Sequence, residues 1–136
     1  MLFNVDFHGT IAGALHDRWI QLQMSLGASC ADNSSIWDNY ARMVFQTRDI
    51  IPLNHNLLVL LSKLRDEGHS IRLWTNANTE LERDIKHILN GYNRIFDSYK
   101  FCSGKKSKTT VEGVVIDNEV QNLKCGQHGV LVPTFR

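Results

Sequence analysis

Four short polar segments hold the side chains in this 136-residue sequence that are best suited to chemistry. They are Asp6-Phe7-His8-Gly9-Thr10, Thr75-Asn76, Ser103-Gly104-Lys105 and Asp117-Asn118. Each segment directly follows a short apolar run. Carboxylates, a hydroxyl group and lysine ammonium groups can together bind a phosphate group and its counter-cation. These residue types therefore indicate phosphoryl chemistry, provided that the fold brings the four segments together.

Asp6 is the candidate nucleophile because Gly9 and Thr10 place it in a turn that follows an apolar run. A carboxylate can attack phosphorus and form an aspartyl-phosphate when a cation offsets the negative charges. Mg²⁺ suits an all-oxygen site of this kind, and Asp117 is the natural second carboxylate for that ion. The hydroxyl group of Thr75 and a lysine of the following cluster would hold the phosphate oxygens.

Five short runs rich in β-branched and aromatic residues predict the strands that would position these segments. They are Leu2–Val5, Ser70–Trp74, Tyr99–Cys102, Gly113–Ile116 and Gly129–Val132. Such apolar strands, separated by helical patterns, predict a parallel sheet that is covered on both faces. Ligands bind beyond the carboxyl ends of the strands in open sheets of this kind, so we expect the four polar segments to meet in one crevice.

Three helical patterns lie between the later strands, over Leu57–Leu64, after the capping box Thr79–Glu82 and after Asn118. The chain from about residue 12 to residue 50 lacks a strand pattern and contains two helical ones instead. It therefore predicts a small helical insert after the first strand. We expect residues 1–136 to form a single domain, because the sequence contains no repeat, low-complexity tract or linker.

The composition of the chain argues against several classes of protein. A net charge of +1 without a long basic or acidic block gives no indication of nucleic-acid binding. No apolar stretch approaches the ~20 residues that span a bilayer, and no secretory leader is visible. Three cysteines without metal-ligand spacing are typical of reduced thiols. We therefore expect a cytoplasmic protein with a small-molecule partner and no membrane partner.

The four segments resemble, in order, the four motifs of the haloacid dehalogenase (HAD) superfamily. Val5-Asp6-Phe7-His8-Gly9-Thr10 resembles motif one, D-x-D-G-T, and Leu73-Trp74-Thr75-Asn76 is similar to motif two. The region of Lys105 stands where motif three has its lysine. The stretch from Val115 to Leu123 resembles the D-D-x-x-x-N-L form of motif four. The resemblance runs from Leu2 to about Val132.

This resemblance implies a Rossmann-like α/β HAD fold, with a parallel five-stranded sheet between helices and a small helical cap at about residues 12–50. It also implies a role for each motif residue. Asp6 would be the nucleophile and a Mg²⁺ ligand, and the backbone carbonyl of His8, Asp117 and Asn118 would be further ligands. Thr75, with Asn76 beside it, would bind the phosphate group. A lysine would bridge Asp6 and that group.

Three positions depart from the family pattern or leave it ambiguous. His8 replaces the second aspartate of motif one, the acid and base of the family, and a histidine can exchange a proton near neutral pH. Asn118 replaces an aspartate and removes one negative charge from the metal site. Lys105 fits motif three by its place after the third strand, and Lys108 fits by its approach to Asp117, with Lys106 between them. We favour Lys105.

The function expected from these residues and from the resemblance is that of a Mg²⁺-dependent phosphohydrolase. It would act on a small phosphate ester, such as a nucleotide or sugar phosphate, through an aspartyl-phosphate on Asp6. His8 and Asn118 leave open a catalytically silent HAD-like binding protein. A dehalogenase-like hydrolase that attacks carbon is a further alternative, since such relatives also lack the second aspartate.

Overall fold

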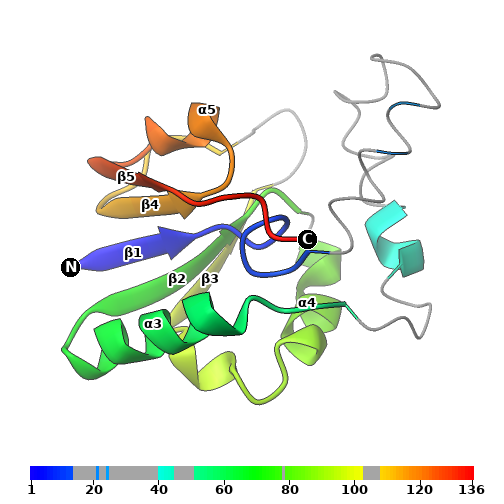
Figure 1. The fold of residues 1–136 in the computed structure, drawn as a ribbon, viewed down its shortest axis with the longest axis horizontal. Helices are drawn as coiled ribbons and strands as arrows, with labels where there is room; N and C mark the ends of the chain where they lie inside the picture. The colour runs from blue at the N-terminus through cyan, green and yellow to red at the C-terminus, as the bar shows by residue number, and fades with distance from the viewer. Residues whose placement is uncertain (14–20, 22–23, 25–39, 45–50, 78, 103–107) are drawn as a thin grey trace.

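The computed structural model describes residues 1–13, 21, 24, 40–44, 51–77, 79–102 and 108–136. In this part of the chain a five-stranded parallel sheet has the strand order β3-β2-β1-β4-β5 (Figure 1). The strands are β1 (Leu2–Val5), β2 (Ser70–Thr75), β3 (Ser98–Phe101), β4 (Val114–Asp117) and β5 (His128–Leu131). This architecture confirms the predicted α/β class and the five predicted strands, whose ends shift by at most one residue.

The strand order reverses at β1. From β1 the chain moves outward through β2 to β3, and it then returns to β4 on the other side of β1. Val5 of β1 pairs with Leu73 of β2 and with Ile116 of β4, so the three strands end almost level with one another. A crevice forms where the order reverses, and in open α/β sheets this is the usual ligand site. The topology therefore places any site beyond the ends of β1 and β4.

The helices between the strands are short. The structure contains α3 (His55–Asp66), the 3₁₀ turn η2 (Thr79–Leu81), α4 (Glu82–Ile88), the 3₁₀ turn η3 (Asn93–Ile95) and α5 (Val120–Leu123). Helix α3 begins where the side chain of Asn54 accepts a hydrogen bond from the backbone N–H of Leu57 at 3.2 Å. The helical pattern after Thr79 begins as a 3₁₀ turn, so its α-helical part starts only at Glu82.

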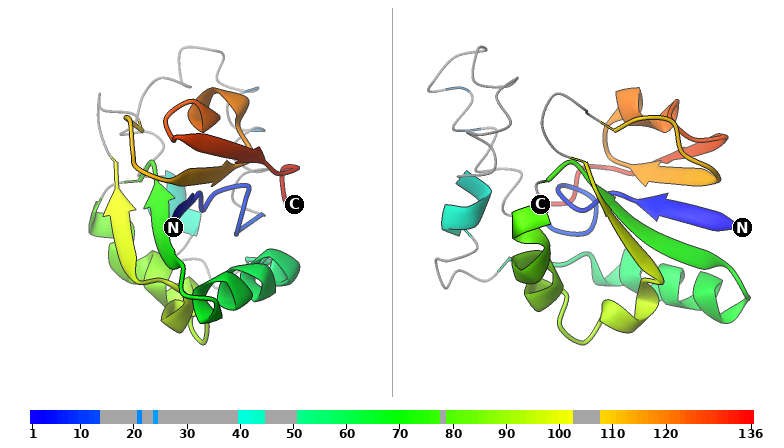
Figure 2. Two further views of the ribbon diagram at one scale, coloured as in Figure 1. Left: turned by 90° about the vertical axis from the view of Figure 1, so that its left-hand side faces the viewer. Right: turned by 180° about the vertical axis from the view of Figure 1, so that it is seen from behind.

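The two faces of the sheet are covered differently. Helices α3 and α4 lie on one face, and α5 lies on the opposite face against β4 and β5 (Figure 2). The first face carries a large core to which the strands contribute Val5, Leu73 and Ile116 and the helices Leu58 and Leu61 of α3 and Leu81 and Ile85 of η2 and α4. The opposite face carries a small cluster made of Trp74, Val111 and Val115, flanked by Cys102, Leu123 and Cys125.

The predicted insert falls largely outside the described residues. Residues 40–44 are helical, as the second helical pattern of the insert predicts, and Ala41 and Val44 are buried in the large core. Leu53, where the chain returns from this segment, forms an antiparallel bridge with Ala12. The single-domain assignment and the role of the insert as a cap stay predictions.

Candidate active site

Three strands deliver buried polar side chains to the same edge of the sheet. Asp6 directly follows β1, Thr75 is the last residue of β2, and Asp117 is the last residue of β4. All three are buried, with 7%, 0% and 0% of their surface exposed. The buried carboxylates of Asp6 and Asp117, on neighbouring strands, require hydrogen-bond donors and positive charge around them.

The loop after β1 fixes Asp6 at the end of its strand. The backbone N–H of Asp6 still donates to Ile116 at 3.0 Å, and the carbonyl group of Phe7 then accepts from the backbone of Ile11 and Ala12, both at 2.9 Å. Gly9 lies in the left-handed region with φ +81°, a conformation that a side chain disfavours. This turn brings the hydroxyl group of Thr10 back onto Asp6 Oδ2, at 2.9 Å.

Lys108 joins the two carboxylates. Its Nζ donates to Asp6 Oδ1 at 2.7 Å and to Asp117 Oδ2 at 2.8 Å, and its side chain is only 2% exposed. The same ammonium group lies 4.4 Å from the centre of the Trp74 ring, so the indole ring stabilises the cation through a cation–π contact. Asp6, Lys108 and Asp117 therefore form a buried charged cluster with a net charge of −1.

The surroundings change the acidity of both ends of this cluster. Burial raises the pKa of Asp6 from 3.8 to about 6; Lys108 and Thr10 oppose this shift, and Asp117 adds to it. Burial alone would lower the pKa of Lys108, but the carboxylates of Asp6 and Asp117 together raise it above its ordinary value. Lys108 is thus a permanent cation, while Asp6 is a carboxylate at neutral pH.

The start of α5 holds Asp117. Its Oδ1 accepts from the backbone N–H of Glu119 at 2.9 Å, and its Oδ2 accepts from Asn122 Nδ2 at 3.1 Å. Asn122 occupies the asparagine position of the fourth sequence motif, but the sequence alone assigned it no role. Its contact gives a physical reason for the spacing, because one turn of helix returns the Asn122 side chain to the strand end.

The carboxamide of Asn118 has polar neighbours in either of its two orientations. With the oxygen toward the cluster, Oδ1 accepts from Thr10 Oγ1 at 3.2 Å and Nδ2 donates to Thr134 Oγ1 at 3.2 Å. With the nitrogen toward the cluster, that atom lies 3.0 Å from Asp6 Oδ2 and 3.1 Å from Asp117 Oδ1, and the oxygen accepts from Thr134 Oγ1 at 3.2 Å. The opposite orientation would set an amide oxygen against two carboxylate oxygens. The orientation with the oxygen inward is the one that suits the predicted metal role of Asn118, because a cation could lie between these oxygens, and that role stays a prediction.

The hydroxyl group of Thr75 is fully buried and has no hydrogen-bond partner among the described residues. A buried hydroxyl group of this kind normally has a partner, so this one is suited to a ligand oxygen. Asn76, its neighbour in the chain, is exposed. The second sequence motif thus offers one buried and one exposed polar group near the strand ends.

His8 lies two residues beyond Asp6 and is only 9% exposed. Its ring packs edge-on against Phe7, with ring centres 4.9 Å apart. The backbone of His8 forms an isolated β-bridge with Ala12. Its predicted roles as acid and base and as a carbonyl metal ligand stay predictions. Lys105 and Lys106 lie outside the described residues. Lys108 is the lysine that the structure describes in contact with Asp6 and Asp117.

Four residues to which the sequence assigned no function lie around the cluster. Three contact it directly, namely Thr10, Trp74 and Asn122. Thr134 contacts Asn118 beside it. Thr10, Trp74 and Asn122 stand inside the sequence motifs, where their position is the only signal. Thr134 stands outside every motif. Among the described residues, no group of three or more His, Cys, Asp or Glu side chains is gathered as for a metal ion, and no helix is long and apolar enough to cross a membrane.

Two solved structures resemble this one over nearly its whole length. A predicted phosphoglycolate phosphatase from Haemophilus somnus 129PT has a TM-score of 0.61 at 13% identity, with 98% of this chain and 88% of that chain covered. A HAD-superfamily hydrolase from Ehrlichia chaffeensis has a TM-score of 0.58 at 14% identity, with 97% and 86% covered.

Comparison with protein-family models and with curated protein sequences found no match. At identities of 13% and 14%, the resemblance to the solved structures is one of fold. Both TM-scores exceed 0.5 over nearly the whole length of this chain, whose five strands form one parallel sheet. The chain therefore has the fold of the HAD superfamily.

Proposed function

We propose that the chain is a Mg²⁺-dependent HAD-type phosphohydrolase that acts on a small phosphate ester through Asp6. The observation that carries this proposal is the buried cluster Asp6–Lys108–Asp117 at the carboxyl ends of β1 and β4. The adjacent strand β2 ends in Thr75, whose buried hydroxyl group has no partner among the described residues. A buried carboxylate with a raised pKa at such an edge is typical of a functional group rather than of a structural ion pair.

Asp6 would supply the nucleophilic oxygen. Its carboxylate would form a bond to phosphorus while the bond from phosphorus to the ester oxygen breaks, and the departing oxygen would take a proton. Water would then cleave the aspartyl-phosphate, releasing phosphate and restoring the carboxylate. His8, two residues further on, is the candidate donor and acceptor of these protons, because imidazole exchanges protons near neutral pH.

Lys108 is the lysine that we propose for the third motif, in place of Lys105. It already donates to Asp6 at 2.7 Å, so it could contact a phosphoryl group that approaches the same carboxylate. Its buried positive charge would oppose the charge that develops on the transferring group. The buried Thr75 and the exposed Asn76 that follows it would hold the phosphate oxygens.

The oxygen ligands of the cluster fit a magnesium ion. The carboxylates of Asp6 and Asp117 already converge on one cation, the Lys108 ammonium group, so their oxygens can share a second cation. Mg²⁺ is commonly held by one or two carboxylates with the remaining positions taken by water, and the His8 carbonyl would complete the protein's share. When bound, the ion would offset the negative charges of Asp6 and of the phosphate group.

A silent binding protein is the second candidate, and one observation favours it. In the orientation with its nitrogen inward, the Asn118 amide would lie 3.0 Å from Asp6 Oδ2, on a side of the nucleophile where the family pattern has a carboxylate. A protein of this kind would bind phosphate at Thr75 and Lys108 without turnover. A nucleotide or sugar phosphate is the proposed substrate or ligand in either case, within a single domain capped by the insert at about residues 12–50.

Hydrolysis of a generic aryl phosphate, with and without Mg²⁺, tests the proposal. We expect Mg²⁺-dependent turnover in the wild type, its loss in Asp6→Asn, and its retention in Asp66→Asn, which removes an exposed carboxylate on α3. Turnover that survives in Asp6→Asn would exclude Asp6 as the nucleophile. No turnover in the wild type at any pH that titrates His8, together with binding of inorganic phosphate by calorimetry, would favour the binding protein.

A further inference from the structure

The sheet has two edges, β3 and β5, and they differ in how they are protected. A sheet edge offers unpaired backbone groups to other chains, and natural proteins commonly guard it with charged side chains. Strand β3 carries Lys100, and the ammonium group of Lys86 lies 4.5 Å from the centre of the Tyr99 ring on the same strand. The four residues of β5 include no Lys, Arg, Asp or Glu; they are His128, Gly129, Val130 and Leu131.

Apolar side chains are exposed at the β5 edge. Val130 and Leu131 have 46% and 54% of their surface exposed. Val120 of α5, the helix that packs against β5, is 65% exposed. Among the described residues, β5 pairs with β4 alone. An uncharged edge with exposed apolar side chains is typical of a strand that pairs with another chain.

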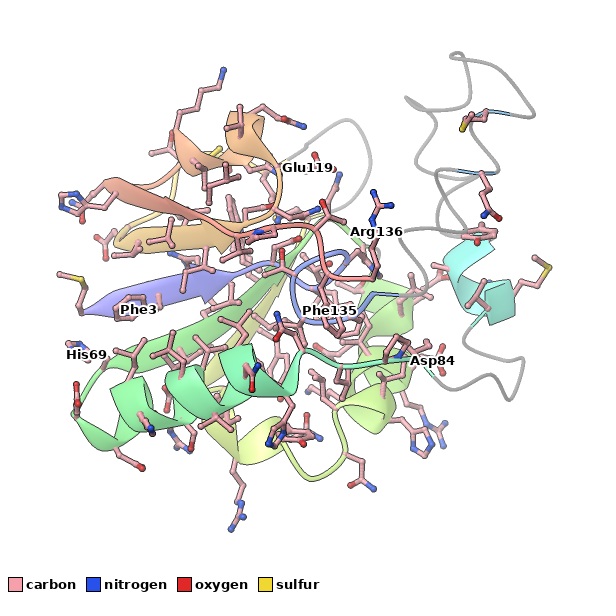
Figure 3. All side chains as sticks on the ribbon, viewed as in Figure 1. Phe3, His69, Asp84, Glu119, Phe135 and Arg136 are labelled. Carbon is pink, nitrogen blue, oxygen red and sulfur yellow. The ribbon has the colours of Figure 1, made fainter. Side chains whose placement is uncertain are left out.

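The chain after β5 leaves this edge open. The backbone N–H of Val132 donates to the carbonyl group of Asp117 at 3.0 Å, and the N–H of Phe135 donates to the carbonyl group of Gly9 at 2.7 Å. The segment therefore runs inward, across the ends of β4 and β1, to the position of Phe135 in Figure 3. It does not follow the outer side of β5, so it does not protect the backbone groups there.

The outward-facing backbone groups of β5 follow from its pairing with β4. In a parallel pair, every second residue bonds to the neighbouring strand. The N–H groups of His128 and Val132 both donate toward β4, at 3.4 Å and 3.0 Å. The N–H and C=O groups of Gly129 and Leu131, which alternate with these residues, therefore face outward.

The open part of the edge ends on both sides of these two residues. On one side, Gln127 already donates its N–H to the carbonyl group of Gly113 at 2.9 Å. On the other side, Pro133 has no N–H to offer. The open edge therefore spans residues 129–131 and is centred on Val130.

We propose that β5 pairs antiparallel with β5 of a second copy of this chain, about a two-fold axis at Val130. Gly129 then lies opposite Leu131 of the second copy, and Leu131 lies opposite its Gly129. Each of these two pairs exchanges two hydrogen bonds, so the outward N–H and C=O groups of both strands are all used. The two sheets become one continuous sheet. This inference goes beyond the proposed function and does not depend on it.

The side chains of β5 fit this arrangement. Gly129 and Leu131 lie on the same face of the sheet, because alternate residues of a strand do. Each Leu131 therefore stands opposite a residue without a side chain, which leaves room for it. A Cβ atom at Gly129 would lie 2.7 Å from the Cβ atom of Leu123 on α5, so the fold itself requires this glycine. The two Val130 side chains meet at the axis, and such β-branched pairs stabilise antiparallel strands.

A second copy suits this edge better than a strand of another protein or a growing fibre. Two identical edges without charged side chains do not repel each other. The open segment of residues 129–131 is its own complement in the antiparallel register centred on Val130. Pairing uses the β5 edge of both copies and leaves the β3 edges, which carry Lys100. Assembly should therefore stop at the dimer.

Sedimentation velocity over a series of concentrations tests the proposal. We expect the wild type to change from monomer to dimer with a dissociation constant of roughly 10–100 µM, as a small interface gives. Val130→Lys sets two like charges against each other at the axis and should raise this constant by at least about tenfold. Leu60→Lys adds the same charge on α3, at a side chain that is 50% exposed, and should leave the constant within about twofold.

Leu131→Pro is a second variant that acts on the hydrogen bonds. It removes an outward N–H that β4 does not use, so the single chain keeps its pairing while the dimer loses one hydrogen bond from each strand. We expect dimerisation to weaken by at least about tenfold. Circular dichroism at a concentration where the wild type is monomeric should match the wild type for both variants.

Amide hydrogen exchange of the wild type tests the register without any substitution. The N–H groups of Gly129 and Leu131 should exchange fast well below the dissociation constant and slowly well above it. The N–H of Val130, which faces β4, should be protected at both concentrations. This measurement decides if either variant fails to fold.

Four outcomes would overturn the proposal. They are a wild type that stays monomeric over the whole series, species larger than the dimer, a dimer that neither Val130→Lys nor Leu131→Pro weakens, and exchange at Gly129 and Leu131 that does not change with concentration.

Discussion

The two faces of the sheet differ in size and in what they contribute. The face under α3 and α4 carries the large core, whose members are almost all apolar. The opposite face carries the small cluster of Trp74, Val111 and Val115, and the buried side chain of Asn4 that donates to the carbonyl groups of Glu112 and Val114. The only lysine buried among the described residues, Lys108, lies over Trp74 on this smaller face.

This difference indicates a division of labour. The large core supplies most of the buried apolar area, and therefore most of the hydrophobic stabilisation. The small cluster buries little area, but its largest member is the surface on which the bridging cation rests. We therefore expect substitutions on the large face to change stability with little effect on chemistry, and substitutions on the small face to change chemistry directly.

Replacing Lys108 by methionine should have the largest effect. The carboxylates of Asp6 and Asp117 would be left buried without their cation, which should lower the free energy of unfolding by about 3–5 kcal/mol. Loss of the buried charge should also lower turnover by at least about a hundredfold. Urea denaturation and kcat measure the two effects. Lys86→Met, which breaks an exposed pair with Glu82, should change stability by less than about 0.5 kcal/mol and serves as the control.

Leu61→Ala and Trp74→Leu test the two faces against each other. Leu61 is fully buried in the large core. Leu61→Ala should lower the free energy of unfolding by about 2–5 kcal/mol. Its kcat, measured well below the melting temperature, should stay within about twofold of the wild type. Trp74→Leu should lower kcat by about tenfold because Lys108 loses the ring beneath it, and Trp74→Phe should lower it less. Equal losses of kcat in Leu61→Ala and Trp74→Leu would contradict the division of labour.

The pH dependence of Asp6 should give the smallest effect. In the metal-free protein we expect its carboxyl group to titrate at about 6, followed by the ¹³C shift of the carboxyl carbon, and to titrate higher still in Lys108→Met. Because the folded pKa lies above the unfolded value of 3.8, the folded state keeps a proton that the unfolded chain has already lost. The contribution of this proton to stability is full below about pH 4 and falls as pH rises through about 6.

Asp6→Asn provides the control for this titration. It should remove the slope of stability against pH between about 4 and 6, which for one group cannot exceed about 1.4 kcal/mol per pH unit. Because only the carboxylate form can attack, the same titration gives the pH range in which the nucleophile loses its proton in the metal-free protein. An Asp6 that titrates near its ordinary value would show that the small face leaves the nucleophile solvated.

The fold was predictable because its signals are local. Each strand is an apolar run bounded by polar or turn residues, and the order of runs and helical patterns already implies parallel strands. The convergence of Asp6, Thr75 and Asp117 then follows from the strand ends alone. The capping box Thr79–Glu82 marks the start of a helical segment, but its first turn is the 3₁₀ turn η2 and the α-helix begins only at Glu82.

The side-chain contacts of the site were not predictable, because they join segments that are far apart in the sequence and meet only in the folded chain. Lys108 contacts Asp6 only because the chain before β4 crosses the end of β1, and no local pattern separates it from Lys105. The polar neighbours of the Asn118 carboxamide come from the loop after β1, the end of β4 and the segment after β5 together. Thr134 lies in a segment without periodicity, so its contact with Asn118 has no trace in the sequence.

The ion pair between Asp6 and Lys108 joins residues separated by 102 positions. Contacts of such long sequence separation form slowly in folding, because the chain between them must first be ordered. A partly folded chain can form α3 and pair β2 with β3 while Asp6 is still far from Lys108, because β1 and β4 also pair across a long sequence separation. Recovery of turnover after dilution from denaturant should therefore lag behind recovery of helical structure, so that turnover reports the last stage of folding.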